Sequence, residues 1–471
     1  MGNKYEVVIV GGGISGAALA YELARYTDIK SICVIEKYEG IGILNTSGRS
    51  NSQTIHFGDI ETNYTLEKAA VTKQTGKMVE KYCLQHGLEN DVMHSHQKMA
   101  LGVGDKEVEY MLNRYTEFKD LFPNLQVWDK EKLKELEPRL IFDQNGKERP
   151  ETVVGVGSIG EWTTVDFERM AKSLIEKAQE EEGTTVDVLL NTKVEKMAKD
   201  GEKFIVTTSG KTIEGDFVVA NAGAHSLLLA HEMGYGHEFS CLPVAGSFYL
   251  TNDTMLNGKV YMVQNPKLPF AALHGDPDIL EDGLTRFGPT ALVMPKLERY
   301  RAPLLDLDFW KTLRLDGTII KILFDLMSDS DVRNYILRNF LFEIPYFNKL
   351  LFVKDAKKII PALTADEIRY ADGFGGVRPQ VLNKVEGKLM LGEASINTGE
   401  GIIFNMTPSP GATSCLGNAK RDVLNVTKFL GKTFDLEKFE RELVEKVPEP
   451  GNVDKDEQMK NVAKIRSQMK N

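Results

Sequence analysis

The chain has 471 residues, of which 42% are hydrophobic and 27% are charged, and its formal net charge is −10 at pH 7. This is the composition of a globular protein large enough for two domains around a substantial core. The acidic charge disfavours nucleic acid as a partner, because phosphate backbones would be repelled, and no apolar run of about 18 residues occurs that could span a bilayer.

The spacing of the cysteines and the sequence of the N-terminus both bear on the cellular compartment. Cys33, Cys83, Cys241 and Cys415 lie far apart and form no CxxC pair, so we expect buried thiols, with no disulfide framework and no metal site. The chain enters its first apolar run without a signal sequence. Both features are typical of a protein of the reducing cytosol.

The N-terminal 40 residues carry a nucleotide-binding pattern. Residues 5–10, YEVVIV, predict a strand that ends in a GxGxxG loop, a helix is predicted over 14–26, and a second strand ends in an acidic residue. Such a loop lets a pyrophosphate approach the backbone at a helix start, and the acidic side chain can accept both ribose hydroxyls. The predicted contacts are Gly11, Gly13, Ile14, Ser15, Gly16, Glu36 and Lys37.

The cofactor could be FAD or NAD on this pattern alone. NAD enzymes usually continue with further βαβ units, whereas here the pattern stops and resumes near residue 190 with NTKVEKM and VVANAGAHS. That discontinuity favours FAD, with Val194 beside the adenine and Ala222 and Gly223 close to the pyrophosphate.

Residues 50–65, SNSQTIHFGDIETNYT, follow the second strand and are predicted to run beneath the flavin ring. Ser50, Ser52 and Gln53 would donate hydrogen bonds, and His56 would face the substrate. A single histidine is more often structural than catalytic, so His56 is a secondary candidate. Helices are predicted over 66–87, within 106–140 and over 165–182, the last with Thr164 or Asp166 as its cap, and alternating strands follow up to residue 220.

Strands, prolines and aromatic residues from 241 to about 363 predict a second domain. Within it, His274 follows an apolar strand and has the chemistry of a base for a 2-hydroxy acid, and Asp276 could orient it unless it faces elsewhere. Arg378 is the first choice for a substrate carboxylate. Lys296 and Arg299 are second choices, and a solvated surface position is the alternative for both.

The bulky apolar residues of 303–354 alternate with seven basic residues. The pattern could lie on a membrane surface, or it could pack between helices of the substrate domain. In the first case these side chains would enter the membrane: Phe309, Trp310, Ile319, Ile320 and Leu323.

Residues 405–415, NMTPSPGATSC, predict a strand stopped by prolines and followed by a helix start. Gly411 permits close approach, Pro410 ends the strand, and the amides of Ala412 and Thr413 remain free. Such an end can stabilise negative charge that develops on a reduced flavin. An ordinary junction between a loop and a helix is the alternative.

Several segments together resemble FAD-dependent malate:quinone oxidoreductases, from about Tyr5 to Leu430: residues 50–65, CLPVAGSFY, VQNPKLPFAALHGDPD, GPTALVMPKLER, GFGGVRPQVL and FNMTPSPGATSCL. The resemblance implies non-covalent FAD, oxidation of (S)-malate to oxaloacetate in the citric acid cycle, transfer of electrons to membrane quinone, and a peripheral position on the inner face of the cell membrane. The motifs are more loosely similar to L-2-hydroxyglutarate oxidases and the glycine oxidase and D-amino-acid oxidase superfamily, in which residues matching His274 and Arg378 face the flavin. The SQTIH segment differs from the longest family members, so 2-hydroxyglutarate and lactate are alternative substrates.

The sequence therefore predicts an α/β protein with a discontinuous Rossmann-like FAD domain and a mixed-sheet substrate domain. A soluble oxidase that uses oxygen and a non-enzymatic FAD-binding protein are the rival hypotheses. The FAD domain is predicted over 1–90, 156–238 and 366–446, the substrate domain over 91–155 and 239–365, and a polar tail with at most a short helix over 447–471.

Overall fold

A discontinuous sheet organises the N-terminal part of the fold. The computed structural model describes residues 3–264, 273–303, 305–344, 347–390, 393–445 and 451–469. In the first sheet the strand order is β21-β22-β11-β1-β2-β8, with β10 and β9 added beside β11. The strands are β1 (Lys4–Val10), β2 (Ser31–Ile35), β8 (Thr185–Leu189), β9 (Val194–Asp200), β10 (Lys203–Thr208), β11 (Thr212–Ala220), β21 (Ala394–Asn397) and β22 (Ile402–Met406).

The centre of this sheet is parallel, since β1 pairs in parallel with both β2 and β11, and β11 with β22. Parallel strands are covered on both faces, and the apolar runs VVIV and FVVA, which end β1 and β11, are accordingly buried. Strands from the two ends of the chain thus belong to one sheet, with β11 between β1 and β22. The α/β class and the discontinuous sheet predicted from the sequence are confirmed.

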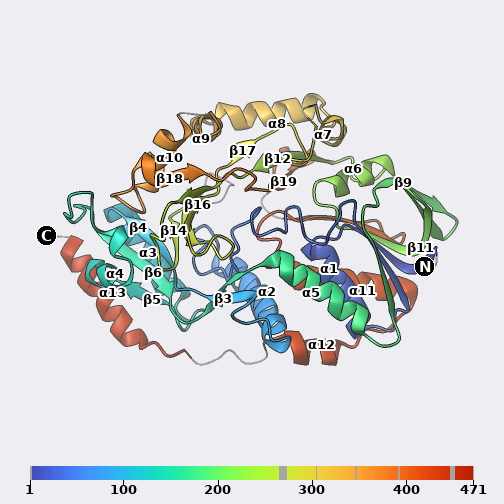
Figure 1. Cartoon of the computed structure of the whole chain (residues 1–471), viewed down its shortest axis with the longest axis horizontal. Coiled ribbons are helices and arrows are strands. Elements are labelled where there is room, and N and C mark those ends of the chain that lie inside the picture. Colours follow the sequence, from blue (N-terminus) through green and yellow to red (C-terminus); the bar gives the residue numbers. More distant parts are fainter. Residues whose placement is uncertain are drawn as a thin grey trace.

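Helices α1 (Ile14–Tyr26), α5 (Phe167–Glu180) and α11 (Cys415–Leu430) share one large core with this sheet (Figure 1). Small residues of α1 allow close packing, and both α5 and α11 contact it. Asp166 caps α5 by accepting the amides of Glu168 and Arg169, which confirms one of the two predicted caps. The helix α2 (Leu66–Gln85) also matches its prediction, and α6 (His225–Glu232) and α12 (Leu436–Leu443) complete this region.

A second, mixed sheet has the order β18-β13-β16-β15-β14-β4-β6-β5. It buries its own apolar cluster against α4 (Lys130–Leu136) and α10 (Asn348–Ala356). Its strands are β4 (Lys98–Val103), β5 (Gln126–Trp128), β6 (Val153–Ser158), β13 (Tyr249–Thr251), β14 (Lys259–Met262), β15 (His274–Pro277), β16 (Thr285–Gly288) and β18 (Ile368–Tyr370). The helices α3 (Asp105–Phe118) and α4 (Lys130–Leu136) flank it, with short 3-10 turns at Pro138–Leu140 and Ala365–Glu367.

A small sheet of order β17-β12-β19-β20 connects the two larger ones. Its strands are β12 (Phe239–Ala245), β17 (Leu292–Val293), β19 (Val377–Asn383) and β20 (Lys388–Leu389), and a separate pair joins β3 (Met93–Ser95) to β7 (Trp162–Val165). Four successive helices run along one edge of the molecule (Figure 1): α7 (Leu307–Leu313), α8 (Gly317–Ser328), α9 (Ser330–Leu341) and α10 (Asn348–Ala356).

The C-terminal segment corrects one expectation. Instead of a polar tail, it forms α13 (Lys455–Met469), which buries Val462 and Ile465 and packs on β5 and α3. Gln458 accepts the Val127 amide at 2.8 Å. Only three of the fifteen residues of α13 are buried. This amphipathic pattern is too weak to be recognised from the sequence.

The four cysteines are buried and free, as expected. Among the described residues, no helix combines the length and apolar character that crossing a bilayer would require.

Candidate functional site

One cavity of about 500 Å³ lies where the first sheet, the second sheet and the small sheet meet. Its walls come from the loop after β1, the end of β2, the 50–56 segment, β15, β19 and the turn before α11. Most of the residues predicted from the sequence line it: Gly11, Gly13, Ile14, Ser15, Glu36, Lys37, Ser50, Ser52, His56, Val194, Ala222, Gly223, His274, Arg378, Pro410, Gly411, Ala412 and Thr413.

The glycine loop has the close backbone contacts that a dinucleotide cradle needs. Gly11 has φ +110°, and a Cβ there would lie 2.3 Å from the carbonyl oxygen of Asn221. A Cβ on Gly16 would lie 2.0 Å from the carbonyl oxygen of Gly11, so Gly16 sets the packing of α1 on β1 although it does not line the cavity. Gly13 lines the cavity at the start of α1, where no acidic side chain occupies the first turn. The residues present therefore fit a pyrophosphate at this helix start.

Glu36 lies at the end of β2, as a ribose-binding residue requires. Its two carboxylate oxygens accept the amides of Gly12 at 2.8 Å and Tyr38 at 2.9 Å. These bonds fix the carboxylate beside the cavity, and a carboxylate keeps further acceptor capacity for hydroxyl groups.

The turn before α11 differs in one detail from its prediction. The helix begins at Cys415 with Ser414 as N-cap, so Ala412 and Thr413 belong to the preceding turn. In the described part of the chain neither of their amides makes a hydrogen bond, and both residues line the cavity. Close packing explains Gly411, where a Cβ would lie 2.9 Å from the carbonyl oxygen of Pro408. The free donors are present as expected, in a turn and not in the helix.

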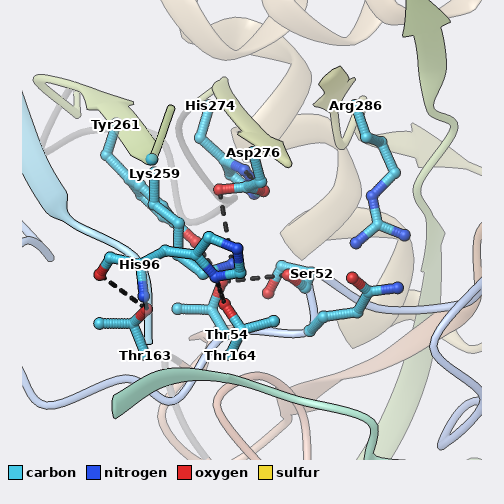
Figure 2. A network of polar contacts seen from close by, with 12 residues as sticks. Ser52, Thr54, His96, Thr163, Thr164, Lys259, Tyr261, His274, Asp276 and Arg286 are labelled. Atoms are coloured by element: carbon cyan, nitrogen blue, oxygen red, sulfur yellow. Dashed lines mark hydrogen bonds and ion pairs between the residues drawn. The ribbon is translucent and has the colours of Figure 1, made fainter. Parts of the chain in front are cut away.

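His274 and Asp276 form a pair at the cavity wall (Figure 2). Alternate residues of a strand point to the same face, so positions 274 and 276 of β15 bring Nδ1 to within 2.5 Å of Oδ2. Asp276 therefore faces His274, which resolves the doubt left by the sequence. Burial lowers the pKa of His274; Asp276 acts in the opposite direction, and Lys259 and Arg286 add to the lowering. A neutral imidazole backed by a carboxylate can accept a proton.

Buried cations on the neighbouring strands surround this pair (Figure 2). The Lys259 amine of β14 lies 3.8 Å from Asp276 Oδ1, and Arg286 of β16 pairs with Asp278 at 3.0 Å. Burial acts to raise the pKa of Asp276, but His274 and Lys259 outweigh it and hold that pKa at about 2. Asp276 thus stays ionised beside His274. Tyr261 stacks on the imidazole with ring centroids 4.3 Å apart.

His56 forms a second histidine–carboxylate pair in the same cavity. Its Nδ1 lies 2.5 Å from Glu61 Oε1, and its amide donates to the Thr413 hydroxyl at 3.1 Å. The loop that carries both residues is held by Arg114, whose guanidinium donates to four of its carbonyl oxygens. His56 therefore remains a candidate for proton transfer beside His274.

Arg378 contributes a positive charge to the cavity wall. It lies on β19, opposite Val244 of β12. Burial lowers its pKa, partly offset by Tyr335 and Tyr261, yet a guanidinium stays charged in proteins. In the described part of the chain no acidic side chain pairs with it. A half-buried cation that faces a cavity and has no acidic partner among the described residues is suited to an anionic ligand.

Besides Gly16, two predicted residues, Gln53 and Lys296, do not line the cavity. Gln53 is buried, and its amide donates to Gly48 and Asp278 while its oxygen accepts the amide of Ile279, so it braces the loop. The Lys296 amine lies 3.5 Å from the Ala302 carbonyl oxygen and is absent from the cavity wall. Arg299, the other second choice, is committed to Gly246, Ser247, Glu343 and Tyr370.

Sequence reasoning missed Tyr261, Lys259, Glu61 and Glu298. Only the period-two spacing of 259 and 261 could have indicated a shared strand face. Glu61 pairs with His56 only five residues earlier, but no local pattern marks that contact, and the partners of Glu298 lie in distant segments.

Comparison with known proteins agrees with the fold and the site. The family model "FAD dependent oxidoreductase" matches residues 6–421. The "Probable malate:quinone oxidoreductase" of Campylobacter jejuni is 56% identical, covering 94% of this chain and 99% of that protein. The "Malate:quinone oxidoreductase" of Helicobacter pylori is 47% identical, covering 94% and 98%. The solved FAD-bound L-alpha-glycerophosphate oxidase of Mycoplasma pneumoniae has a TM-score of 0.61 at 20% identity, covering 92% of this chain and 96% of that one.

The fold and the glycine cradle therefore define an FAD-dependent oxidoreductase. Within that class, the chain belongs to the malate:quinone oxidoreductase family.

Proposed function

We propose that this protein oxidises (S)-malate to oxaloacetate and passes the electrons to a membrane quinone. The observation that supports it most directly is the meeting of Arg378, which has no acidic partner in the described residues, with the His274–Asp276 pair in one cavity. A dicarboxylate needs a cation to hold it, and its hydroxyl group needs a base.

The roles of the chain's own residues follow from this arrangement. Arg378 binds a carboxylate of malate through charge-assisted hydrogen bonds and orients the C2 carbon. His274 accepts the hydroxyl proton, and the ionised Asp276 at its Nδ1 stabilises the imidazolium. FAD held without a covalent bond by the glycine loop and the turn before α11 would supply the hydride acceptor and the route of electrons to quinone. Lys296 is excluded from the substrate site because it does not reach the cavity.

The test is anaerobic stopped-flow absorbance of the purified yellow protein, mixed separately with (S)-malate, (S)-2-hydroxyglutarate and (S)-lactate. We expect fast bleaching with malate alone and reoxidation by a soluble quinone. In Arg378→Met the apparent affinity or rate for malate should fall by about 10² to 10³, the effect of removing one partner of a buried charge pair.

Lys296→Met is the matched control, because it removes one positive charge outside the cavity, and it should bleach as the parent protein does. Bleaching by another acid would assign a different substrate to the same site. Equal losses in the two variants would contradict the role given to Arg378, and a flavin that none of the acids reduces would contradict the function.

The exposed helices α7 to α10 are proposed as the membrane-facing surface. On α8, Ile320, Phe324 and Met327 are spaced on one helix face and are 56%, 70% and 38% exposed. On α9, Leu337 and Phe340 are 52% and 57% exposed. Half of the large apolar side chains exposed in the described residues lie between positions 305 and 350. Such a surface is suited to the interface of a lipid bilayer, where a quinone would be available.

The side chains expected to enter the membrane divide into two groups. Phe309 and Ile319 are buried in the core and Leu323 packs against it, as the alternative interpretation predicted. Trp310 and Ile320 are exposed. The helices therefore have two apolar sides, one facing the protein core and one facing solvent.

A further inference from the structure

Glu298 occupies an unusual place at the nucleotide end of the cavity. It belongs to the 294–303 loop, which follows β17, yet its carboxylate contacts residues of the first sheet. Its oxygens accept hydrogen bonds from the Lys37 amine and the Tyr38 hydroxyl, and His225 Nδ1 lies 3.9 Å away. Only 4% of the side chain is exposed, and it lines the cavity together with these three partners.

The three partners of Glu298 come from segments that follow two different strands of the first sheet. Lys37 and Tyr38 follow β2, and His225 opens α6 shortly after β11. In the sheet, β1 lies between β11 and β2. The carboxylate therefore reaches segments that follow both strands flanking β1, and it lines the same cavity as the glycine loop where the pyrophosphate is expected.

The 294–303 loop is fixed on its other side by buried contacts. Arg299 donates to the Gly246 carbonyl at 2.5 Å, to the Ser247 hydroxyl at 2.6 Å and to Glu343 at 3.0 Å. The Leu297 amide donates to Asp306, the N-cap of α7, at 2.8 Å. Glu298 is thus held on a rigid support outside the first sheet, so its contacts join two parts of the molecule.

The electrostatics favour a charged pair at this point. Burial acts to raise the pKa of Glu298, but Lys37 and the Tyr38 hydroxyl outweigh it and the pKa is lowered. Burial also lowers the pKa of His225 to about 4, which leaves that imidazole neutral. An ionised carboxylate with a single close cation and two hydrogen bonds is a strong contact in a buried setting.

We propose that Glu298 is a cofactor-retaining residue, which closes the nucleotide end of the cavity over bound FAD by joining the 294–303 loop to Lys37 and Tyr38. This rests on the proposed function, in which FAD is held by no covalent bond, so that its rate of release depends on how often this closure opens. Arg301, which pairs with Glu39 at 3.0 Å and lies over the Tyr38 ring, is a more exposed second contact of the same loop.

The experiment follows release of FAD from the holoprotein after dilution, by the rise in flavin fluorescence. Glu298→Gln keeps the size of the side chain and removes its charge, and we expect release at least about tenfold faster. Glu39→Gln is the matched control, since the Arg301–Glu39 pair joins the same two segments but is largely exposed, and its release rate should change less than about threefold.

Thermal unfolding of both variants by circular dichroism separates retention from stability. Fast release by Glu298→Gln with an unfolding temperature close to that of Glu39→Gln supports the proposal. Release at the parental rate overturns it, and so does release that accelerates only in proportion to a loss of global stability. The double variant Lys37→Met/Glu298→Gln tests whether the two side chains act as a pair. If it releases FAD no faster than the faster of the two single variants, a direct pair is supported. If the fold-increases of the two single variants multiply, a direct pair is contradicted.

Discussion

The role of His274 depends on which side chains its own side chain faces. The sequence indicated a residue with the chemistry of a base, and strand periodicity places Asp276 on the same face. The neighbours on β14 and β16 could not be predicted, because no local pattern specifies which strands pair with β15. The glycine loop and Arg378 were predicted because their chemistry is local. Glu61 and Glu298 were not, because their partners are recognised only after folding.

Replacing the two histidines tests which of them is the base. His274→Ala should slow flavin reduction by malate by about 10² to 10⁴, the usual contribution of a general base. His56→Ala should slow it less, because in the proposed mechanism His274, and not His56, accepts the hydroxyl proton. Single-turnover reduction rates measure both, and the reverse order would transfer the role to His56.

Lys259 is expected to act on His274 without touching substrate. The groups that face the His274–Asp276 pair are Lys259 and Tyr261 from β14 and Arg286 from β16. Removing a positive charge that lowers the pKa of His274 must raise that pKa, so the acidic limb of the pH–rate profile moves to higher pH. We therefore expect this limb to lie at higher pH in Lys259→Met than in the parent protein.

The profile of kcat/KM against pH measures this shift, because it reports groups of the free enzyme. The exposed Lys106→Met serves as the control with the same change in net charge. An unmoved acidic limb, or an equal movement in the control, would show that Lys259 has only a structural role.

At the scale of elements, α8 and α9 combine two apolar sides. Sequence periodicity indicated amphipathic helices but could not distinguish the side facing the core from the side facing solvent, because both are rich in Ile, Leu and Phe. Core packing of Ile319 and Ile322 settles which side is internal. The other side then remains available to a lipid surface.

Sedimentation with vesicles of phosphatidylcholine and phosphatidylglycerol tests this surface. The double variant Phe324→Asp/Leu337→Asp should bind at least about tenfold more weakly, since each apolar side chain contributes about 1.5–3 kcal/mol when buried. Val71→Asp/Leu424→Asp alters side chains that are 64% and 47% exposed on α2 and α11, and should bind as the parent does. Equal binding by both double variants would place the lipid contact elsewhere.

At the scale of the whole molecule, local sequence patterns predicted where helices and strands lie along the chain. They did not predict which of these elements pack together. The first βαβ unit, α2 and α5 follow from periodicity and caps. The second sheet does not, because it places β4 from near residue 100 beside β14 from near residue 260. Such pairings depend on which surfaces remain to be buried once local structure has formed, and α13 was underestimated for the same reason.

The chain order of the first sheet has a consequence for biosynthesis. Two of its central strands are complete by Ile35, but β22 begins only at Ile402, and the bond from the His56 amide to Thr413 joins residues 357 positions apart. A ribosome must therefore release almost the entire chain before the flavin pocket can close. Nascent chains that stop before β22 would carry the glycine loop but lack the turn that brings the Ala412 and Thr413 amides to the cavity.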